Sequence, residues 1–228
     1  MYCKLVLFVV LFSLLTTASQ ATELNAGFGS RYVSEGRNQL SSGGIYWVGA
    51  VHNINENMSL GIAYGLGSDS TANYDELNLS AVYSNSAASF DYTLAYTRLE
   101  FFKDNASDDE LSLSIAYTEI ALFTPLSNLV YSVAADGAFI DIGGEKEFQI
   151  NRDFLITPYI LVAYDFGYAN GQEEGYNHTS IGVSLNYIVS ENISITALAE
   201  NNIGGSIIQR EGAKTDQFHS GIYLSYIW

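Results

Sequence analysis

On the proposed inward face of the alternating stretches described below, few side chains could support acid–base or ionic chemistry. They comprise one arginine, three carboxylates and two histidines: Arg31, Asp136, Asp165, His178, Glu200 and His219. If these side chains line a passage, its acidic excess favours cations over anions by charge. The alternative is a satisfied internal network, in which the arginine is paired with a carboxylate and the interior is plugged. The sequence leaves both interpretations open.

One short motif suggests nucleophilic catalysis. His178 and Ser180 lie two residues apart, and Glu173 or Glu174 could supply a carboxylate. Serine catalysis requires the hydroxyl within hydrogen-bond reach of a histidine that an acid orients, and small lipid deacylases use such a His-x-Ser arrangement. The alternation described below points both side chains inward, away from lipid. We therefore expect no enzyme, and a lipid hydrolase stays a minor alternative.

Two acidic segments, residues 103–110 and 172–174, could hold divalent cations that bridge to lipopolysaccharide phosphates, because carboxylates are hard oxygen ligands. Neither segment has EF-hand spacing, and solvated acidic loops are the more ordinary interpretation. The sequence contains no metal-ligand cluster, no phosphate-binding glycine loop and no nucleotide motif. No metal site and no cofactor are therefore expected.

The elements that must position these residues are β-strands. Residues 58–67 alternate large apolar side chains with serine, glycine and alanine, and residues 179–189 and 218–228 show the same period of two. The chain divides in this way into about twelve strands, at 23–33, 44–53, 58–67, 74–84, 89–102, 110–123, 129–138, 140–150, 154–167, 178–189, 193–203 and 216–228. Only Asp136 and Gly137 separate the seventh from the eighth, so a barrel of about ten strands is the alternative.

Connection lengths alternate along the chain. Short turns are predicted at 53–57, 85–88, 124–128, 151–153 and 190–192, and mostly longer loops at 34–43, 68–73, 103–109, 168–177 and 204–215. Short turns on one rim and long loops on the other are typical of an up-and-down transmembrane β-barrel, with both termini on the short-turn rim. The predicted fold class is thus all-β, an antiparallel transmembrane barrel.

Composition favours this fold over a secreted β-sandwich. Only 15% of the residues are charged, whereas a water-facing surface carries about a quarter to a third. The small residues then face a narrow lumen, and tyrosines near strand ends are expected to form interfacial girdles: Tyr32, Tyr46, Tyr74, Tyr131, Tyr168, Tyr187 and Tyr226. The net charge of −16 argues against nucleic acid as a partner, since phosphate binding needs clustered lysine and arginine.

The first residues have the pattern of a secretory signal peptide. Lys4 provides a positive start, residues 5–15 are apolar apart from one serine, and Ser19 and Ala21 occupy the positions that a signal peptidase reads. The apolar run is shorter than the roughly 20 residues that span a bilayer as a helix. We predict a cleaved segment at 1–21, a barrel at 22–228, and residence in a bacterial outer membrane. Cleavage removes the only cysteine, Cys3.

The C-terminus ends on alternating aromatic residues. Tyr226 and Trp228 are in phase with the apolar face of the last predicted strand. Such an ending is like the signal by which outer-membrane barrels are passed to the barrel-assembly machinery. The expected partners are therefore that machinery, outer-membrane lipids and lipopolysaccharide, and small solutes.

The segment GFGSRYVSEGRNQ at 27–39, followed by GGIY at 43–46, resembles the opening of the TorF-type porins, a family of small bacterial outer-membrane barrels. Glu35 stands where that family pattern would have arginine. The resemblance implies an outer-membrane β-barrel with a pore function and no agreed substrate.

The sequence thus predicts a porin that lets small solutes or ions diffuse passively through a narrow acidic lumen. Two alternatives remain: a structural or adhesive barrel with a plugged lumen, and the lipid hydrolase.

Overall fold

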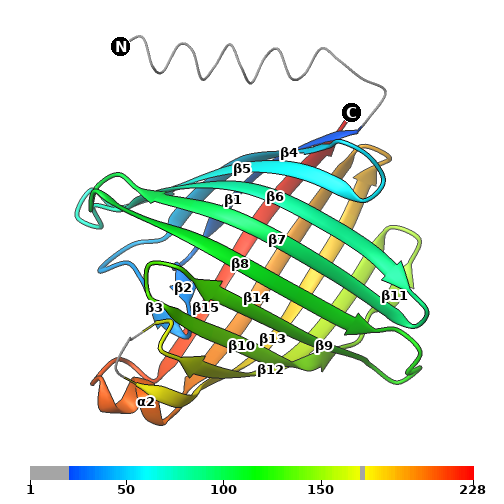
Figure 1. The fold of residues 1–228 in the computed structure, drawn as a ribbon. Coiled ribbons are helices and arrows are strands. Elements are labelled where there is room, and N and C mark those ends of the chain that lie inside the picture. Colours follow the sequence, from blue (N-terminus) through cyan, green and yellow to red (C-terminus); the bar gives the residue numbers. More distant parts are fainter. Residues whose placement is uncertain (1–20, 170–172) are drawn as a thin grey trace, which may run out of the picture.

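The computed structural model describes residues 21–169 and 173–228. The predicted signal peptide therefore falls, apart from Ala21, outside the described residues and stays a prediction. Within the described ranges, the chain forms one barrel of tilted antiparallel strands (Figure 1). No helix in these ranges is both long and apolar enough to cross a membrane.

Twelve strands form the wall. They are β1 (Thr22–Gly29), β4 (Ile45–Asn53), β5 (Met58–Gly67), β6 (Asp75–Ala87), β7 (Phe90–Phe101), β8 (Ala106–Tyr117), β9 (Thr124–Ser132), β10 (Gly137–Glu145), β12 (Phe154–Phe166), β13 (Glu174–Ser190), β14 (Ile193–Gly204) and β15 (Asp216–Ile227). Strands consecutive in this order pair with one another, and β1 pairs with β15, so the sheet has no free edge. A short strand, β11 (Phe148–Asn151), continues the line of β10 along β12. The predicted barrel of about twelve strands is confirmed.

Three predicted connections are displaced. Residues 85–87 of the turn expected at 85–88 belong to β6, and the turn lies at 88–89. The turn expected at 124–128 lies instead at 118–123, and residues 124–128 open β9. Polar residues and Pro125 suggested a turn. A proline near the beginning of a strand is nevertheless tolerated, because strand pairing depends least on its missing backbone N–H there. The acidic end of the loop expected at 103–109 belongs to β8, which begins at Ala106 and carries Asp108, Asp109 and Glu110.

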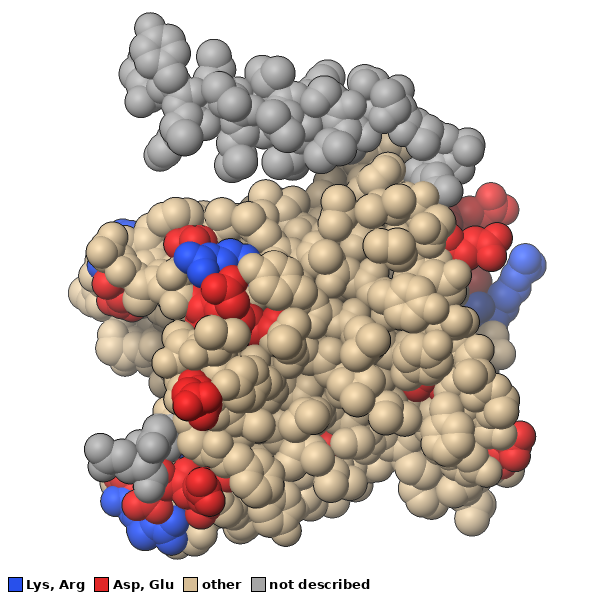
Figure 2. All heavy atoms as spheres, in the orientation of Figure 1, with Lys and Arg blue, Asp and Glu red and all other residues tan. Residues whose placement is uncertain are grey.

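The outer surface is apolar between two charged ends. Outward positions in mid-strand include Leu60, Ile142, Ile181 and Ile222, which are 46%, 50%, 49% and 56% exposed. Figure 2 shows charged side chains gathered mainly near the two ends of the barrel, with a broad surface between them that is almost free of charge. A belt of this kind is the lipid-facing surface of a transmembrane barrel.

The inward face is built from small residues that make room for a few inward aromatic rings. A Cβ placed on Gly182 of β13 would lie 2.3 Å from Cζ of Tyr159 on β12. Only a glycine therefore allows this ring to lie across the neighbouring strand.

Two loops close over the end of the barrel that is opposite the termini. The loop between β1 and β4 contains the hairpin formed by β2 (Val33–Ser34) and β3 (Arg37–Asn38). The loop between β14 and β15 contains the short helix α2 (Ser206–Arg210). Leu40, Ile45, Ile207 and Ile208 are at most 3% exposed, and all lie in these loops or at their borders. The main apolar cluster thus lies at the loop end.

Candidate functional site: an acidic lumen divided by a hairpin

The β2–β3 hairpin turns over two residues in left-handed conformations. Ser34 pairs with Arg37, and between them Glu35 has φ 46° and Gly36 has φ 72°. Two consecutive positive φ angles characterise a type I′ turn, which matches the twist of the paired strands. Glutamate at the first of these positions is uncommon, because side chains other than Asn and Asp rarely adopt this region.

The hairpin reaches across the lumen. At its base the Tyr32 hydroxyl donates to Glu76 Oε2 of β6 at 2.9 Å. At its tip Gly36 contacts β13, because a Cβ placed there would lie 2.8 Å from Cγ of His178 and 2.8 Å from Cδ1 of Ile208 in α2. Strands β6 and β13 are half-way round the ring from each other. The hairpin therefore divides the loop end of the lumen.

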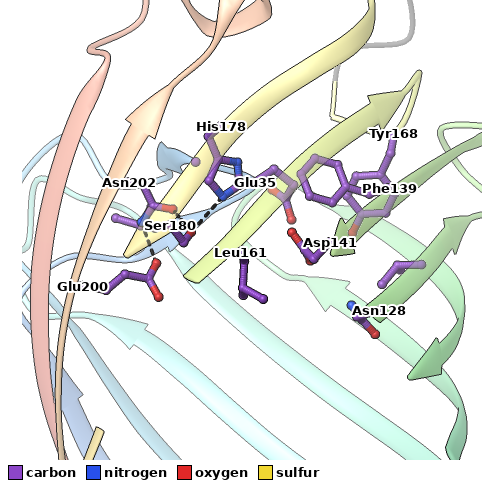
Figure 3. A pocket seen from close by; sticks show the side chains of 13 residues that line it. Glu35, Asn128, Phe139, Asp141, Leu161, Tyr168, His178, Ser180, Glu200 and Asn202 are labelled. Carbon is purple, nitrogen blue, oxygen red and sulfur yellow. Dashed lines mark hydrogen bonds between the residues drawn. The ribbon is translucent and has the colours of Figure 1, made fainter. Parts of the chain in front are cut away.

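Two cavities lie along the wall beside the hairpin. The outer one, of about 850 Å³, reaches the loop rim and is bordered by Glu76, Asp108 and Glu110. The inner one, of about 220 Å³, lies deeper in the barrel. Figure 3 shows its lining residues facing a common space; they include Phe139, Asp141, His178, Ser180, Glu200 and Asn202. Both cavities are lined by Glu35, Val130 and Tyr168, which therefore mark their boundary.

Uncharged groups hold several lumen carboxylates. Glu76 accepts from the hydroxyls of Tyr32 and Tyr74, and Glu110 accepts from Tyr168. Burial raises the pKa of the Tyr168 hydroxyl above its ordinary value, with the Glu35 carboxylate adding to the shift, so this phenol stays protonated and remains a donor. Donors of this type fix a carboxylate without cancelling its charge.

The same pattern continues deeper in the lumen. Glu200 accepts from the Tyr159 hydroxyl and from Asn202 Nδ2, the latter at 2.6 Å. Asp165 is 0% exposed and accepts from the Tyr168 backbone N–H at 2.7 Å. Asp165 thus anchors the β12–β13 connection and is less available to a solute than Glu200.

The arginines near the passage have their own partners. Arg37 makes a two-pronged ion pair with Glu211, at 2.8 and 2.7 Å, and donates to the Glu35 backbone carbonyl at 2.8 Å. Arg31 donates to Gln217 Oε1 at 3.1 Å, and not to a carboxylate. Among the described residues, Arg37 is the one arginine that borders the outer cavity. Its charge is largely neutralised by the ion pair with Glu211.

The structure places five of the six predicted lumen residues on the inward side. Asp165, His178 and Glu200 lie together near the inner cavity, and His219 is next to Glu200, with Nε2 3.9 Å from Oε1. Arg31 is nearer the loop rim. Their roles in permeation stay predictions.

Asp136 lies elsewhere. It occupies the turn between β9 and β10 with φ 52°, and its carboxylate accepts from the hydroxyl of Tyr131, an outward residue, at 2.6 Å. The short turn interrupts the alternation, so the position that the sequence pattern assigned to the inward face is in the connection.

The tyrosines also divide into two groups. Tyr46, Tyr131, Tyr187 and Tyr226 are outward and 36–54% exposed, as girdle residues should be. The girdle assignment is wrong for the other three, Tyr32, Tyr74 and Tyr168, whose hydroxyls hold lumen carboxylates. Tyr74 is in phase with Glu76 and shares its inward face, whereas Tyr32 and Tyr168 follow the ends of β1 and β12, where strand alternation no longer determines direction.

The hydrogen-bond directions around Ser180 argue against a serine nucleophile. Glu200 fixes the Asn202 amide with its nitrogen toward the carboxylate, so Asn202 Oδ1 accepts the Ser180 proton at 2.6 Å. His178 Nε2, 3.1 Å from Ser180 Oγ, must then donate. Its Nδ1 accepts from Asn177, in the amide orientation that also lets Asn177 accept from Arg37. A histidine that donates to the serine cannot take up its proton.

The acidic loop residues do not converge on a metal-like site. Glu173 pairs with Arg210 of α2 at 2.5 Å. Across residues 21–169 and 173–228, no group of three or more His, Cys, Asp or Glu side chains is placed to hold a metal ion.

Sequence reasoning missed several carboxylates of the lumen. Glu76, Asp108, Glu110 and Asp141 all lie on inward positions of strands. Extending the period of two backward from Ser112 would have identified Glu110 and Asp108. No comparable signal exists for Glu35, because it reaches the lumen on a loop.

A closed antiparallel barrel with an apolar belt, short turns at the end with the termini and a loop folded inward has the architecture of outer-membrane porins. The chain is similar to solved structures of that class. The KdgM porin matches with a TM-score of 0.60 and 10% identity, over 90% of this chain and 98% of that chain. The NanC porin matches with 0.56 and 11% over the same shares.

An outer-membrane channel from Pseudomonas putida F1 matches with a TM-score of 0.56 and 7% identity, over 93% of this chain and 97% of that chain. No family model and no curated protein matches the sequence. At these identities the likeness is one of fold.

Proposed function

We propose that this protein is an outer-membrane porin that passes small solutes by diffusion and prefers cations to anions. The observation that carries the proposal is the set of lumen carboxylates held by uncharged donors, beside an arginine already paired with Glu211. Charge of one sign along a narrow passage in a low-dielectric wall concentrates ions of the opposite sign.

One structural neighbour provides a contrast. The KdgM porin was solved in complex with oligogalacturonate, which is a polyanion. The lumen of this chain places Glu35, Asp141 and Glu200 around the inner cavity. An acidic oligosaccharide would be repelled there, so small cations and neutral solutes fit this lumen better.

The proposal is tested by refolding the protein, inserting it into planar bilayers and recording single channels under a potassium chloride gradient. We expect discrete conductance steps and a reversal potential of the cation-selective sign. Absence of steps from a correctly folded barrel would favour the plugged alternative. In that alternative the hairpin across the lumen is the plug. A reversal potential of the anion-selective sign would overturn the charge argument.

We also propose membership of the TorF-type porins, export with cleavage after Ala21, and delivery by the barrel-assembly machinery. The stacked pair Tyr226 and Trp228, with ring centroids 5.8 Å apart at the end of the chain, supports the last point. N-terminal sequencing of the membrane-extracted protein tests the cleavage site. Loss of membrane insertion on Trp228→Ser would support the assembly signal, and unchanged insertion would count against it.

A further inference from the structure

We infer that the Glu35 carboxylate, which the hairpin places at the boundary between the two lumen cavities, determines the preference for cations. This inference rests on the proposed porin function and identifies the residue responsible. Glu35 lies on no wall strand, and the predicted lumen set does not contain it.

The position of Glu35 carries the inference. It borders both the outer cavity of about 850 Å³ and the inner cavity of about 220 Å³, a property that it shares with Val130 and Tyr168. Figure 3 shows its side chain between the His178–Ser180 side of the inner cavity and the Tyr168–Phe139 side. Of the three boundary residues, Glu35 is the one that carries charge. An ion passing from one cavity to the other must pass its carboxylate.

The turn geometry is a second, independent observation. Asparagine, aspartate or glycine is the usual residue at the first central position of a type I′ turn, yet Glu35 occupies it with φ 46°. A residue kept in an unfavourable conformation points to a function for its side chain. A long acidic side chain at this position extends into the lumen, which a glycine could not do.

The surroundings leave the charge available. The Glu35 carboxylate accepts from the Ser34 hydroxyl and from Gln39 Nε2, both uncharged. Arg37 contacts the backbone carbonyl of Glu35, and its guanidinium is paired with Glu211. The titratable or charged groups that face Glu35 come from several surrounding elements. They are Tyr32 before β2, Arg37 on β3, Tyr74 before β6, Glu110 on β8, Asp141 on β10, Asp165 on β12, Tyr168 in the β12–β13 loop, His178 on β13 and Glu200 on β14.

The inference has a consequence for pH. Burial raises the pKa of the Glu35 carboxyl to about 7, and the nearby Glu110 and Asp165 add to this against the opposing effects of Ser34 and Arg37. The carboxyl therefore carries its charge above neutral pH and loses it as the pH falls through about 7. Cation preference should weaken over the same interval.

The test is Glu35→Asn, because asparagine suits a type I′ turn and removes the charge without removing the hairpin. In bilayers at about pH 8, we expect the cation-to-anion permeability ratio to fall about fivefold, as loss of one unit charge a few ångströms from the ion path implies. The matched control is Glu56→Gln, an exposed carboxylate in the β4–β5 turn, which should leave the ratio unchanged. Between about pH 8 and pH 6 the ratio should fall more steeply for the unaltered protein than for Glu35→Asn.

A cysteine variant tests the position directly. In a Cys3→Ser background, Glu35→Cys is the only thiol of the chain. A methanethiosulfonate reagent bearing a sulfonate should restore cation preference, and one bearing a quaternary ammonium should reverse or block it. Heat-modifiable migration on gels verifies that each variant is folded.

The outcomes separate the two claims. A cation-selective channel whose ratio is unchanged in Glu35→Asn, or whose Glu35→Cys thiol does not react, overturns the inference and leaves the porin function standing. An unaltered protein that does not conduct, or that prefers anions, overturns the proposed function itself.

Discussion

Hydroxyl groups, rather than cations, hold the acidic side chains of this lumen. Tyr159 of β12 donates to Glu200 on β14, and Tyr168 in the loop after β12 donates to Glu110 on β8. A tyrosine hydroxyl orients a carboxylate but leaves its charge for a solute. The sequence pattern assigned Tyr168 to a girdle and gave no role to Tyr159, because a tyrosine near a strand end has the same pattern whether it faces lipid or the lumen.

Gly36 permits a sharp residue-scale prediction, since Gly212 offers a control with nearly the same backbone. The φ angles are 72° and 71°, but a Cβ on Gly36 would lie 2.8 Å from His178 and Ile208, whereas nothing lies within 4 Å of one on Gly212. Both alanine variants are expected to lose roughly 1–2 kcal/mol from backbone strain. Gly36→Ala should in addition displace the hairpin tip and change single-channel conductance, which Gly212→Ala should not. Equal conductance in the two variants would argue against the docked tip.

At the scale of elements, strands were predictable and the path of the hairpin was not. Alternation identifies β5 (Met58–Gly67) and β14 (Ile193–Gly204) within one residue at each end, because one face meets lipid and the other the lumen along their whole length. Residues 30–44 have no such period. Whether a polar loop extends into water or folds into a barrel depends on contacts with distant strands, here Glu76 and His178, which a local pattern cannot show.

Replacing residues 33–38 by a short Gly-Ser linker tests the hairpin as an element. The wall strands pair with one another without it, so the barrel should still fold. Removing the segment that divides the lumen should raise single-channel conductance and, with Glu35 gone, lower the cation-to-anion permeability ratio. The measurement is a paired recording of variant and unaltered protein. A conductance equal to or below that of the unaltered protein would show that the hairpin does not restrict the passage.

At the scale of the whole molecule, the barrel has its apolar surface outside and its acidic surface inside. The net charge of −16 alone does not establish cation preference, because many acidic residues lie in turns and at strand ends. What matters is that carboxylates such as Glu110 and Glu200 face the lumen.

Adjacent residues of β6 test this orientation. Leu79 is outward and 41% exposed, whereas Ser80 belongs to the inward series that includes Glu76 and Asn78. Leu79→Lys should lower the free energy of unfolding in phospholipid bilayers by about 2–4 kcal/mol, because it places a charge in lipid. Ser80→Lys should cost much less and should weaken cation preference. Urea titration in vesicles measures the free energy of unfolding, and bilayer recording measures the cation preference. If Ser80→Lys lost more stability than Leu79→Lys, the assignment of the two faces would be inverted.

The most direct measurement of the central claim is the reversal potential of the unaltered, refolded protein across a bilayer with a tenfold potassium chloride gradient. An acidic lumen whose carboxylates are held by uncharged donors predicts conductance steps and a reversal potential of the cation-selective sign, smaller at about pH 6 than at about pH 8. A folded barrel with no conductance, or with a reversal potential of the anion-selective sign, would contradict the account.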